Sequence, residues 1–357
     1  MRTYFLISTI ALAMVLQGTH AKGEAKAASS DPCAAFPHED VPQATISNGL
    51  VHALLYLPDP TTGYYRSTRF DWSGIIPCLS YDGHTYFNPW RPQHDPLGHD
   101  SLSGPVEEFH PSDGGLGYGE AKPGGLFVKP GVGVLRKVSD TPYKFSFFYP
   151  IVDLGKWKIR VHRSSVSFTQ TLRSPIGYAY VYTKTVELPK GEAMLVLHHR
   201  MKNAGTRTID MDVYDHDFYR LDNTPTGPGM AVRFAFDPKL EREFKNGGVL
   251  DGREITYRQV LEDRQSVQSP ITGYSNTPAD YKFVVLNQKT GAGVEQTSDQ
   301  PIAHLNFWSV RTVIAPEAYI HLHIEPGQSQ EWTIRYRFFV EKPAMQAQEA
   351  GGSPAGE

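Results

Sequence analysis

Short extended segments follow one another along most of the chain. Many of them alternate apolar with polar residues, as residues 180–188 do, and Gly, Pro, Asn or Asp turns separate them. Because successive side chains of a strand point to opposite faces, this alternation is typical of strands that bury one face in a core. The segments predicted as strands are 54–56, 74–80, 145–152, 157–161, 167–172, 178–188, 193–201, 208–214, 231–236, 281–287, 303–313 and 331–340.

Helical periodicity is weak throughout, and residues 240–244 and 257–263 are predicted to form short helical turns at most. Regularly spaced short strands predict an all-β chain folded as an antiparallel β-sandwich or barrel. We find neither a linker that would divide the chain nor an internal repeat, so residues 41–342 are expected to form one large domain.

The two ends differ from this pattern. Arg2 precedes an apolar run over residues 4–16, and small residues lead to Ala21, which is the order of a secretory signal peptide. The run is too short to cross a bilayer. We therefore expect residues 1–21 to be removed on export, giving a periplasmic or secreted protein that is not held by the membrane. Residues 22–40 and 343–357 are predicted to be a disordered linker and a disordered tail.

Charge and cysteine content limit the kinds of partner and the compartment that are expected. The net charge is −3, and no basic block is present, so neither nucleic acid nor an anionic membrane surface is indicated. A small molecule is the expected partner. Cys33 and Cys78 would meet an oxidising compartment after export, where they could form a disulfide or stay as two free thiols.

Residues 89–133 are rich in Gly, Pro, His and acids. Long loops of this kind on a rigid β scaffold usually line or cap a site. The titratable residues of this region are His94, Asp95, His99, Asp100, Glu107, Glu108, His110, Asp113 and Glu120.

One histidine stands out as a candidate proton donor. His216 lies between Asp215 and Asp217 in an aromatic strand, and Glu317 follows downstream after a proline. A histidine titrates near neutral pH and a carboxylate can be tuned toward it, so the two could act as acid and base. The alternatives are a structural histidine held by its neighbouring aspartates and an exposed turn glutamate.

These residues resemble the galactose mutarotase-like family, which includes the aldose 1-epimerases. Residues 215–221, Asp-His-Asp-Phe-Tyr-Arg-Leu, are similar to the family's Asn-His-x-x-Phe-x-Leu strand. Glu317, the Glu-Pro-Gly-Gln turn at 325–328 and the strand at 331–338 are similar to the family's ending, and residues 71–87 to its early hairpin. The resemblance implies a large antiparallel β-supersandwich that interconverts sugar anomers without a cofactor, with His216 as acid and Glu317 as base.

The chain also departs from that family. The His-Gly-Phe-Ala/Asp loop, which supplies a second histidine to the sugar, has no counterpart in the sequence, and its place falls near Lys129 or near Glu107 and Glu108. The sequence therefore leaves open that the chain acts on a different substrate or catalyses a different reaction. The rival hypotheses are a non-catalytic carbohydrate-binding protein and a carbohydrate lyase or hydrolase whose active groups lie in residues 89–133.

Five residues are candidates for substrate binding. Strand alternation would put Arg66 and Arg69 on opposite faces, so one of them, with Arg69 favoured, is expected to face the site. Glu108 and Lys129 are candidates from the loop-rich region, and Trp308 could stack on a sugar ring. The alternatives are surface salt bridges, solvated loop charges and, for the tryptophan, ordinary core packing.

Two histidine pairs raise the question of a metal. His198 and His199 are adjacent, and His321 and His323 share one face of a strand. Neither pair has an evident third ligand in the sequence, so no metal site is predicted.

Overall fold

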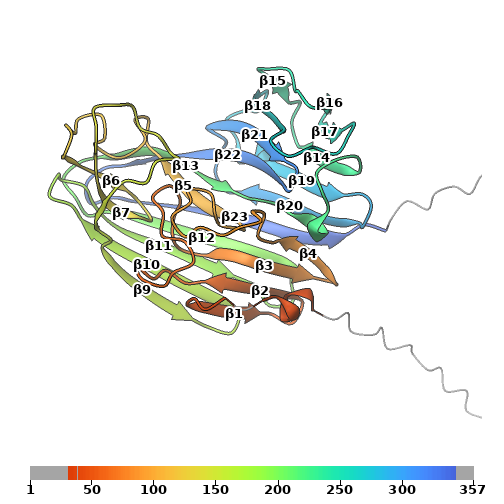
Figure 1. The fold of residues 1–357 in the computed structure, drawn as a ribbon, viewed down its shortest axis with the longest axis horizontal. Helices are drawn as coiled ribbons and strands as arrows, with labels where there is room; N and C mark the ends of the chain where they lie inside the picture. Colours follow the sequence, from red (N-terminus) through yellow and green to blue (C-terminus); the bar gives the residue numbers. More distant parts are fainter. Residues whose placement is uncertain (1–30, 38, 343–357) are drawn as a thin grey trace, which may run out of the picture.

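The computed structural model describes residues 31–37 and 39–342, so the predicted signal peptide and C-terminal tail lie outside the described part (Figure 1). The described chain is almost entirely antiparallel β-structure, arranged in four sheets. The prediction of a large antiparallel β-sandwich is confirmed. Among the described residues, no helix is long and apolar enough to cross a membrane.

Two large sheets form the body of the molecule. The ten-stranded sheet has the order β16 (Gly248–Asp251), β17 (Glu254–Tyr257), β14 (Met230–Phe234), β19 (Lys282–Asn287), β20 (Ala292–Ser298), β23 (Ser329–Val340), β12 (Met194–Asn203), β11 (Ala179–Glu187), β10 (Ser165–Arg173) and β9 (Lys156–Val161). The six-stranded sheet has the order β15 (Lys239–Leu240), β18 (Ser266–Thr272), β21 (His304–Val310), β22 (Val313–Ile324), β13 (Ile209–His216) and β5 (Val106–His110).

Two smaller sheets complete the fold. One contains β1 (Gln43–Ser47), β2 (Val51–Tyr56), β3 (Ile75–Tyr81) and β4 (His84–Phe87), and the other contains β6 (Leu126–Lys129), β7 (Gly133–Arg136) and β8 (Ile151–Asp153). Three short 3-10 helices complete the described elements: η1 (Pro32–Ala35) precedes β1, and η2 (Leu221–Asn223) and η3 (Pro278–Asp280) lie between strands.

The core lies between the two large sheets, where aromatic side chains from both sides meet. Phe109 of β5 packs edge-on against Tyr182 of β11 and Trp332 of β23, with ring centroids 5.2 Å and 6.4 Å apart. All three rings are buried. Because strand side chains alternate, the neighbours of Phe109 in β5 point to the opposite face of the six-stranded sheet. That opposite face carries the cleft described below.

A disulfide between Cys33 and Cys78 attaches η1 to strand β3. The described part of the segment predicted to be a disordered linker therefore contains an ordered turn.

Several local predictions were wrong. Residues 145–152 form turns rather than a strand, apart from the start of β8, and residues 303–313 divide into β21 and the start of β22 at a turn. Residues 240–244 and 257–263 contain no helical turn. The loop-rich region contains strand β5, whose Val-Glu-Glu-Phe-His sequence lacks clear alternation because one of its two glutamates is buried on each face.

Candidate functional site

A cleft of about 450 Å³ opens on the face of the six-stranded sheet that points away from the core. Strands supply most of its lining: Glu108, His110, Tyr214, His216, Gln268, Asn306, Trp308, Glu317 and Tyr319. Loop residues close the rest: Arg69, Trp90, His99, Asp100, Phe145 and Phe218. The size lies within the range of small-molecule sites.

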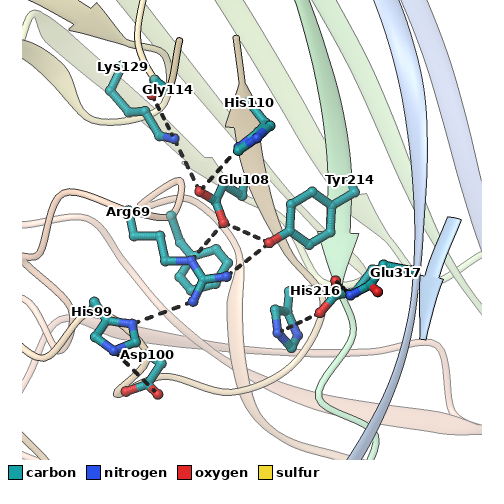
Figure 2. Close-up of polar contacts among 12 residues, drawn as sticks. Arg69, His99, Asp100, Glu108, His110, Gly114, Lys129, Tyr214, His216 and Glu317 are labelled. Atoms are coloured by element: carbon teal, nitrogen blue, oxygen red, sulfur yellow. Dashed lines mark hydrogen bonds and ion pairs between the residues drawn. The ribbon is translucent and has the colours of Figure 1, made fainter. Parts of the chain in front are cut away.

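The structure brings together the two residues predicted as acid and base. Strands β13 and β22 are antiparallel neighbours in which Tyr214 pairs with Tyr319, and a further bridge joins Tyr219 to Ile314. The same register places His216 opposite Glu317. The Nε2 atom of His216 lies 3.2 Å from Oε1 of Glu317 (Figure 2).

Both side chains are nearly removed from solvent, with 4% of His216 and 6% of Glu317 exposed. Asn306, opposite Glu317 in the register of β21 and β22, donates a hydrogen bond of 2.8 Å from Nδ2 to Oε2 of the carboxylate. One carboxylate oxygen is thereby fixed by an amide, and the other faces the imidazole.

Burial perturbs the two groups in opposite directions. Loss of hydration raises the pKa of Glu317 to about 7. Burial, assisted by the positive charge of Arg69, lowers the pKa of His216 well below its ordinary value. In the free protein these shifts place the proton of the pair on Glu317 and leave His216 neutral, with the two groups 3.2 Å apart.

Aromatic rings enclose the imidazole. His216 stacks on Phe218 with a centroid distance of 3.8 Å, while Phe70 and Trp308 meet it edge-on at 5.7 Å and 5.4 Å. Phe218 has φ 45°, a left-handed conformation that is rare for a bulky residue. Backbone outliers of this kind concentrate at functional sites.

A charged network forms another wall of the cleft. Glu108 Oε2 accepts hydrogen bonds of 2.7 Å from Arg69 Nε and from the Tyr214 hydroxyl, and Lys129 Nζ lies 3.3 Å from Oε1 (Figure 2). Burial opposes ionisation of Glu108, but the two cations hold its pKa well below the usual range. Glu108 is therefore a fixed anion that orients the Arg69 guanidinium.

The five predicted substrate-binding residues have different positions. Arg69, Glu108 and Trp308 line the cleft, whereas Lys129 is fully buried and contacts Glu108 from behind. Arg66 does not line the cleft, and its Nη1 donates to the Thr61 carbonyl. The assumption that both arginines lie in a strand was wrong, because residues 57–74 form an irregular loop.

The aspartates beside His216 point into the core rather than toward the imidazole. The Tyr336 hydroxyl lies 2.6 Å from Asp215 Oδ2 and 2.9 Å from Asp217 Oδ1, and it donates its single proton to one of these two carboxyl groups. Neighbouring side chains in a strand face opposite ways, so these carboxylates cannot hold the ring of His216. The interpretation of His216 as a histidine held by its adjacent aspartates is wrong.

Glu107, the neighbour of Glu108 in β5, does not face the cleft but lies in the core. It contacts Lys184 Nζ at 2.5 Å and His199 Nε2 at 2.6 Å, and all three side chains are buried. The carboxylate is kept ionised despite burial, with a pKa lowered to about 2, chiefly by Lys184 and His199.

Some cleft residues were not predicted as site residues from the sequence, namely Tyr214, Asn306, Phe218, Trp90 and Tyr319. Asn306 could have been found only by aligning β21 with β22, and the signal for Tyr214 was its position two residues before His216. His99 and His110 also line the cleft, although no histidine-containing motif marks them in the sequence. The Nδ1 atom of His99 lies 3.5 Å from Arg69 Nη1.

Comparison with solved structures identifies the architecture as the galactose mutarotase-like fold. A galactose mutarotase-like protein from Clostridium acetobutylicum superposes with a TM-score of 0.53 at 11% identity, over 83% of this chain and 95% of that chain. A putative aldose 1-epimerase from Escherichia coli gives 0.52 at 14% identity, over 84% and 99%. By sequence, no protein-family model and no curated protein matches the chain. The predicted fold is therefore confirmed, and at these identities the likeness extends to the fold alone.

Proposed function

We propose that this protein interconverts the anomers of a free sugar or sugar derivative, as an aldose 1-epimerase does, without a cofactor. The observation that carries the proposal is the contact between His216 and Glu317 at 3.2 Å, inside a cleft of suitable size. Their opposite pKa shifts place the proton of the pair on Glu317 in the free protein, and its transfer to His216 across this contact produces the carboxylate base and the imidazolium acid that the reaction needs.

The proposed chemistry conserves protons over each half of the cycle. Glu317 as carboxylate removes the proton of the anomeric hydroxyl while protonated His216 donates a proton to the ring oxygen, and the bond between that oxygen and C1 breaks. The products are an open-chain aldehyde, protonated Glu317 and neutral His216. Rotation about the C1 to C2 bond and reversal of the two proton transfers close the ring with the other configuration at C1.

The remaining cleft residues suit a sugar. Trp308 offers an apolar ring face beside the imidazole, and Arg69 offers N–H donors that its contact with Glu108 holds in place. Asn306 fixes Glu317 and leaves the oxygen next to His216 available for the transferred proton.

We further propose that the protein acts outside the cytoplasm, in the periplasm or as a secreted protein. The disulfide between Cys33 and Cys78 supports this proposal, because such bonds persist chiefly in oxidising compartments.

The decisive assay follows anomer equilibration by polarimetry or NMR after dissolving α-glucose, α-galactose or a uronic acid with the purified chain. We expect acceleration by the wild type, loss of it in His216→Asn and Glu317→Gln, and retention in His198→Asn, which changes an exposed histidine on the other large sheet. Equal activity in wild type and both site variants would contradict the assigned roles. Sugar binding without acceleration would instead favour a non-catalytic carbohydrate-binding protein. Release of an unsaturated product from a polymer would favour a lyase.

A further inference from the structure

A row of histidines and aspartates continues along the sheet beyond the cleft. Side chains two residues apart in β22 share a face, so His321 and His323 lie on the same side as Glu317. Strand β13 places Asp212 opposite His321 and Asp210 opposite His323. Unlike the catalytic pair, His321, His323 and Asp210 are exposed to solvent.

Three of these residues bring ligand atoms close enough to share one ion. One potential ligand atom from each of Asp210, His321 and His323 lies within 4.8 Å of the other two. Zinc bonds of about 2.0–2.2 Å to nitrogen and oxygen place tetrahedral ligand atoms roughly 3.4 Å apart. Since the side chains are exposed, small rotations about their χ angles would reach that spacing.

Asp210 and His323 already contact each other through two atoms of the kind that bind a metal ion. His323 Nδ1 lies 2.6 Å from Asp210 Oδ2, with a proton between them. Replacing that proton by a metal ion requires the two atoms to separate by somewhat less than about 1 Å.

His321 carries an independent sign of ligation. Its Nδ1 atom lies 2.9 Å from Asp212 Oδ1, which fixes the proton on Nδ1 and leaves the lone pair of Nε2 free. A carboxylate bound to the far nitrogen of the ring is the usual support of a metal-ligating histidine. The other oxygen of Asp212 lies 3.4 Å from Nδ1 of a third imidazole, His304.

We propose that Asp210, His321 and His323 form a surface site for a divalent transition metal such as Zn²⁺, with Asp212 orienting His321. Two imidazoles and a carboxylate suit such an ion better than Ca²⁺ or Mg²⁺, which prefer oxygen ligands. The sequence alone predicts no metal here because the third ligand comes from β13, far from the histidines along the chain.

This proposal is independent of the sugar chemistry. His321 lies four residues from Glu317 in an extended strand, or roughly 13 Å along it. A metal at this distance does not touch the acid and base, so its loss leaves anomer equilibration unchanged.

The test is isothermal titration of Zn²⁺ into the mature chain, prepared without a histidine tag, stripped with EDTA and desalted. We expect one saturable ion per chain, an affinity reduced tenfold or more in His321→Ala and in His323→Ala, and no such binding in the double variant. Asp212→Asn should weaken binding about 10- to 100-fold, as loss of a residue that orients a ligand usually does.

The matched control is His198→Ala, because His198 is a similarly exposed histidine that is paired with Glu187 at 3.3 Å and lies outside the group formed by Asp210, His321 and His323. It should bind Zn²⁺ as the wild type does. Absence of saturable binding in the wild type, or its persistence in the His321→Ala/His323→Ala variant, would overturn the proposal. Circular dichroism and the melting temperature without zinc will show that the variants are folded.

Discussion

The most stringent test of the core concerns Lys184, whose ammonium group is fully buried behind the cleft. Lys184 Nζ lies 2.5 Å from Glu107 Oε2 and 3.1 Å from the Ser73 carbonyl oxygen. In Lys184→Met the side chain keeps a similar length but loses its charge. Glu107 then keeps the contact of 2.6 Å with His199 Nε2 but loses its ammonium partner, in a medium that solvates a carboxylate poorly.

The expected loss in the free energy of unfolding follows from the missing positive charge beside Glu107. Removing one partner of a buried ion pair destabilises a protein by about 3–5 kcal/mol, because the other charge is left uncompensated. With an unfolding entropy of about 2.1 cal/mol/K per residue, a domain of roughly 310 residues loses about 1.5 °C of melting temperature per kcal/mol. Lys184→Met should therefore melt roughly 5–8 °C below the wild type.

Differential scanning calorimetry, with urea unfolding as a second measurement, checks this value. The matched control is Lys282→Met, since Lys282 pairs with Glu295 at 2.9 Å but is half exposed, and it should cost less than about 1 kcal/mol. Adding Glu107→Gln to Lys184→Met should recover at least about 1 kcal/mol, because the uncompensated charge is removed. A Lys184→Met variant as stable as the Lys282→Met control would refute the reasoning.

Three further predictions concern protons and the disulfide. Ionisation of Glu317, whose pKa is raised to about 7, removes the shared proton, so the enzyme-catalysed rate of anomer equilibration should fall as the pH rises through about 7; a rate that stays constant to pH 9 would contradict this. Burial raises the pKa of Asp217 in the folded protein well above its ordinary value. The protonated carboxyl therefore contributes its full stabilisation at pH values below the pKa of the unfolded chain. As the pH rises from there to the pKa of the folded protein, the free energy of unfolding falls by about 1.4 kcal/mol per pH unit. Asp217→Asn lacks this loss, so its free energy of unfolding in urea should rise relative to that of the wild type between pH 5 and pH 7. The same difference between variant and wild type at both pH values would count against a buried protonated carboxyl. The disulfide closes a loop with a sequence separation of 45, so Cys33→Ser/Cys78→Ser should lower the free energy of unfolding by about 4 kcal/mol, whereas a loss below about 1 kcal/mol would show that the loop is restrained by other contacts.

The sequence pattern is sufficient to predict an all-β fold. Alternation over residues 180–188 reflects a strand with one buried face, and β11 has that burial pattern. His216 was a candidate from its acidic and aromatic context, whereas only the resemblance to the galactose mutarotase-like family distinguished Glu317 from an exposed turn carboxylate.

What could not be predicted depends on contacts between distant segments. Glu107 faces the core because of the way β5 pairs with β13. The sequence of β5 has no clear periodicity from which this orientation could be inferred. The separation of Arg66 from Arg69 follows from an irregular loop, to which strand alternation does not apply. Likewise, Asp210 joins His321 and His323 only through the register of β13 and β22.

The opposition of His216 and Glu317 across two paired strands separates this pair from the part of the cleft that loops supply. Their spacing is set by the backbone hydrogen bonds of the sheet, whereas Arg69, Trp90, His99 and Phe145 reach the cleft from loops. Loops tolerate changes in sequence and length far better than paired strands do. If the proposed function holds, variation confined to those loops would exchange one sugar for another while the spacing of His216 and Glu317 stays unchanged, so these loops are the place to redesign sugar preference.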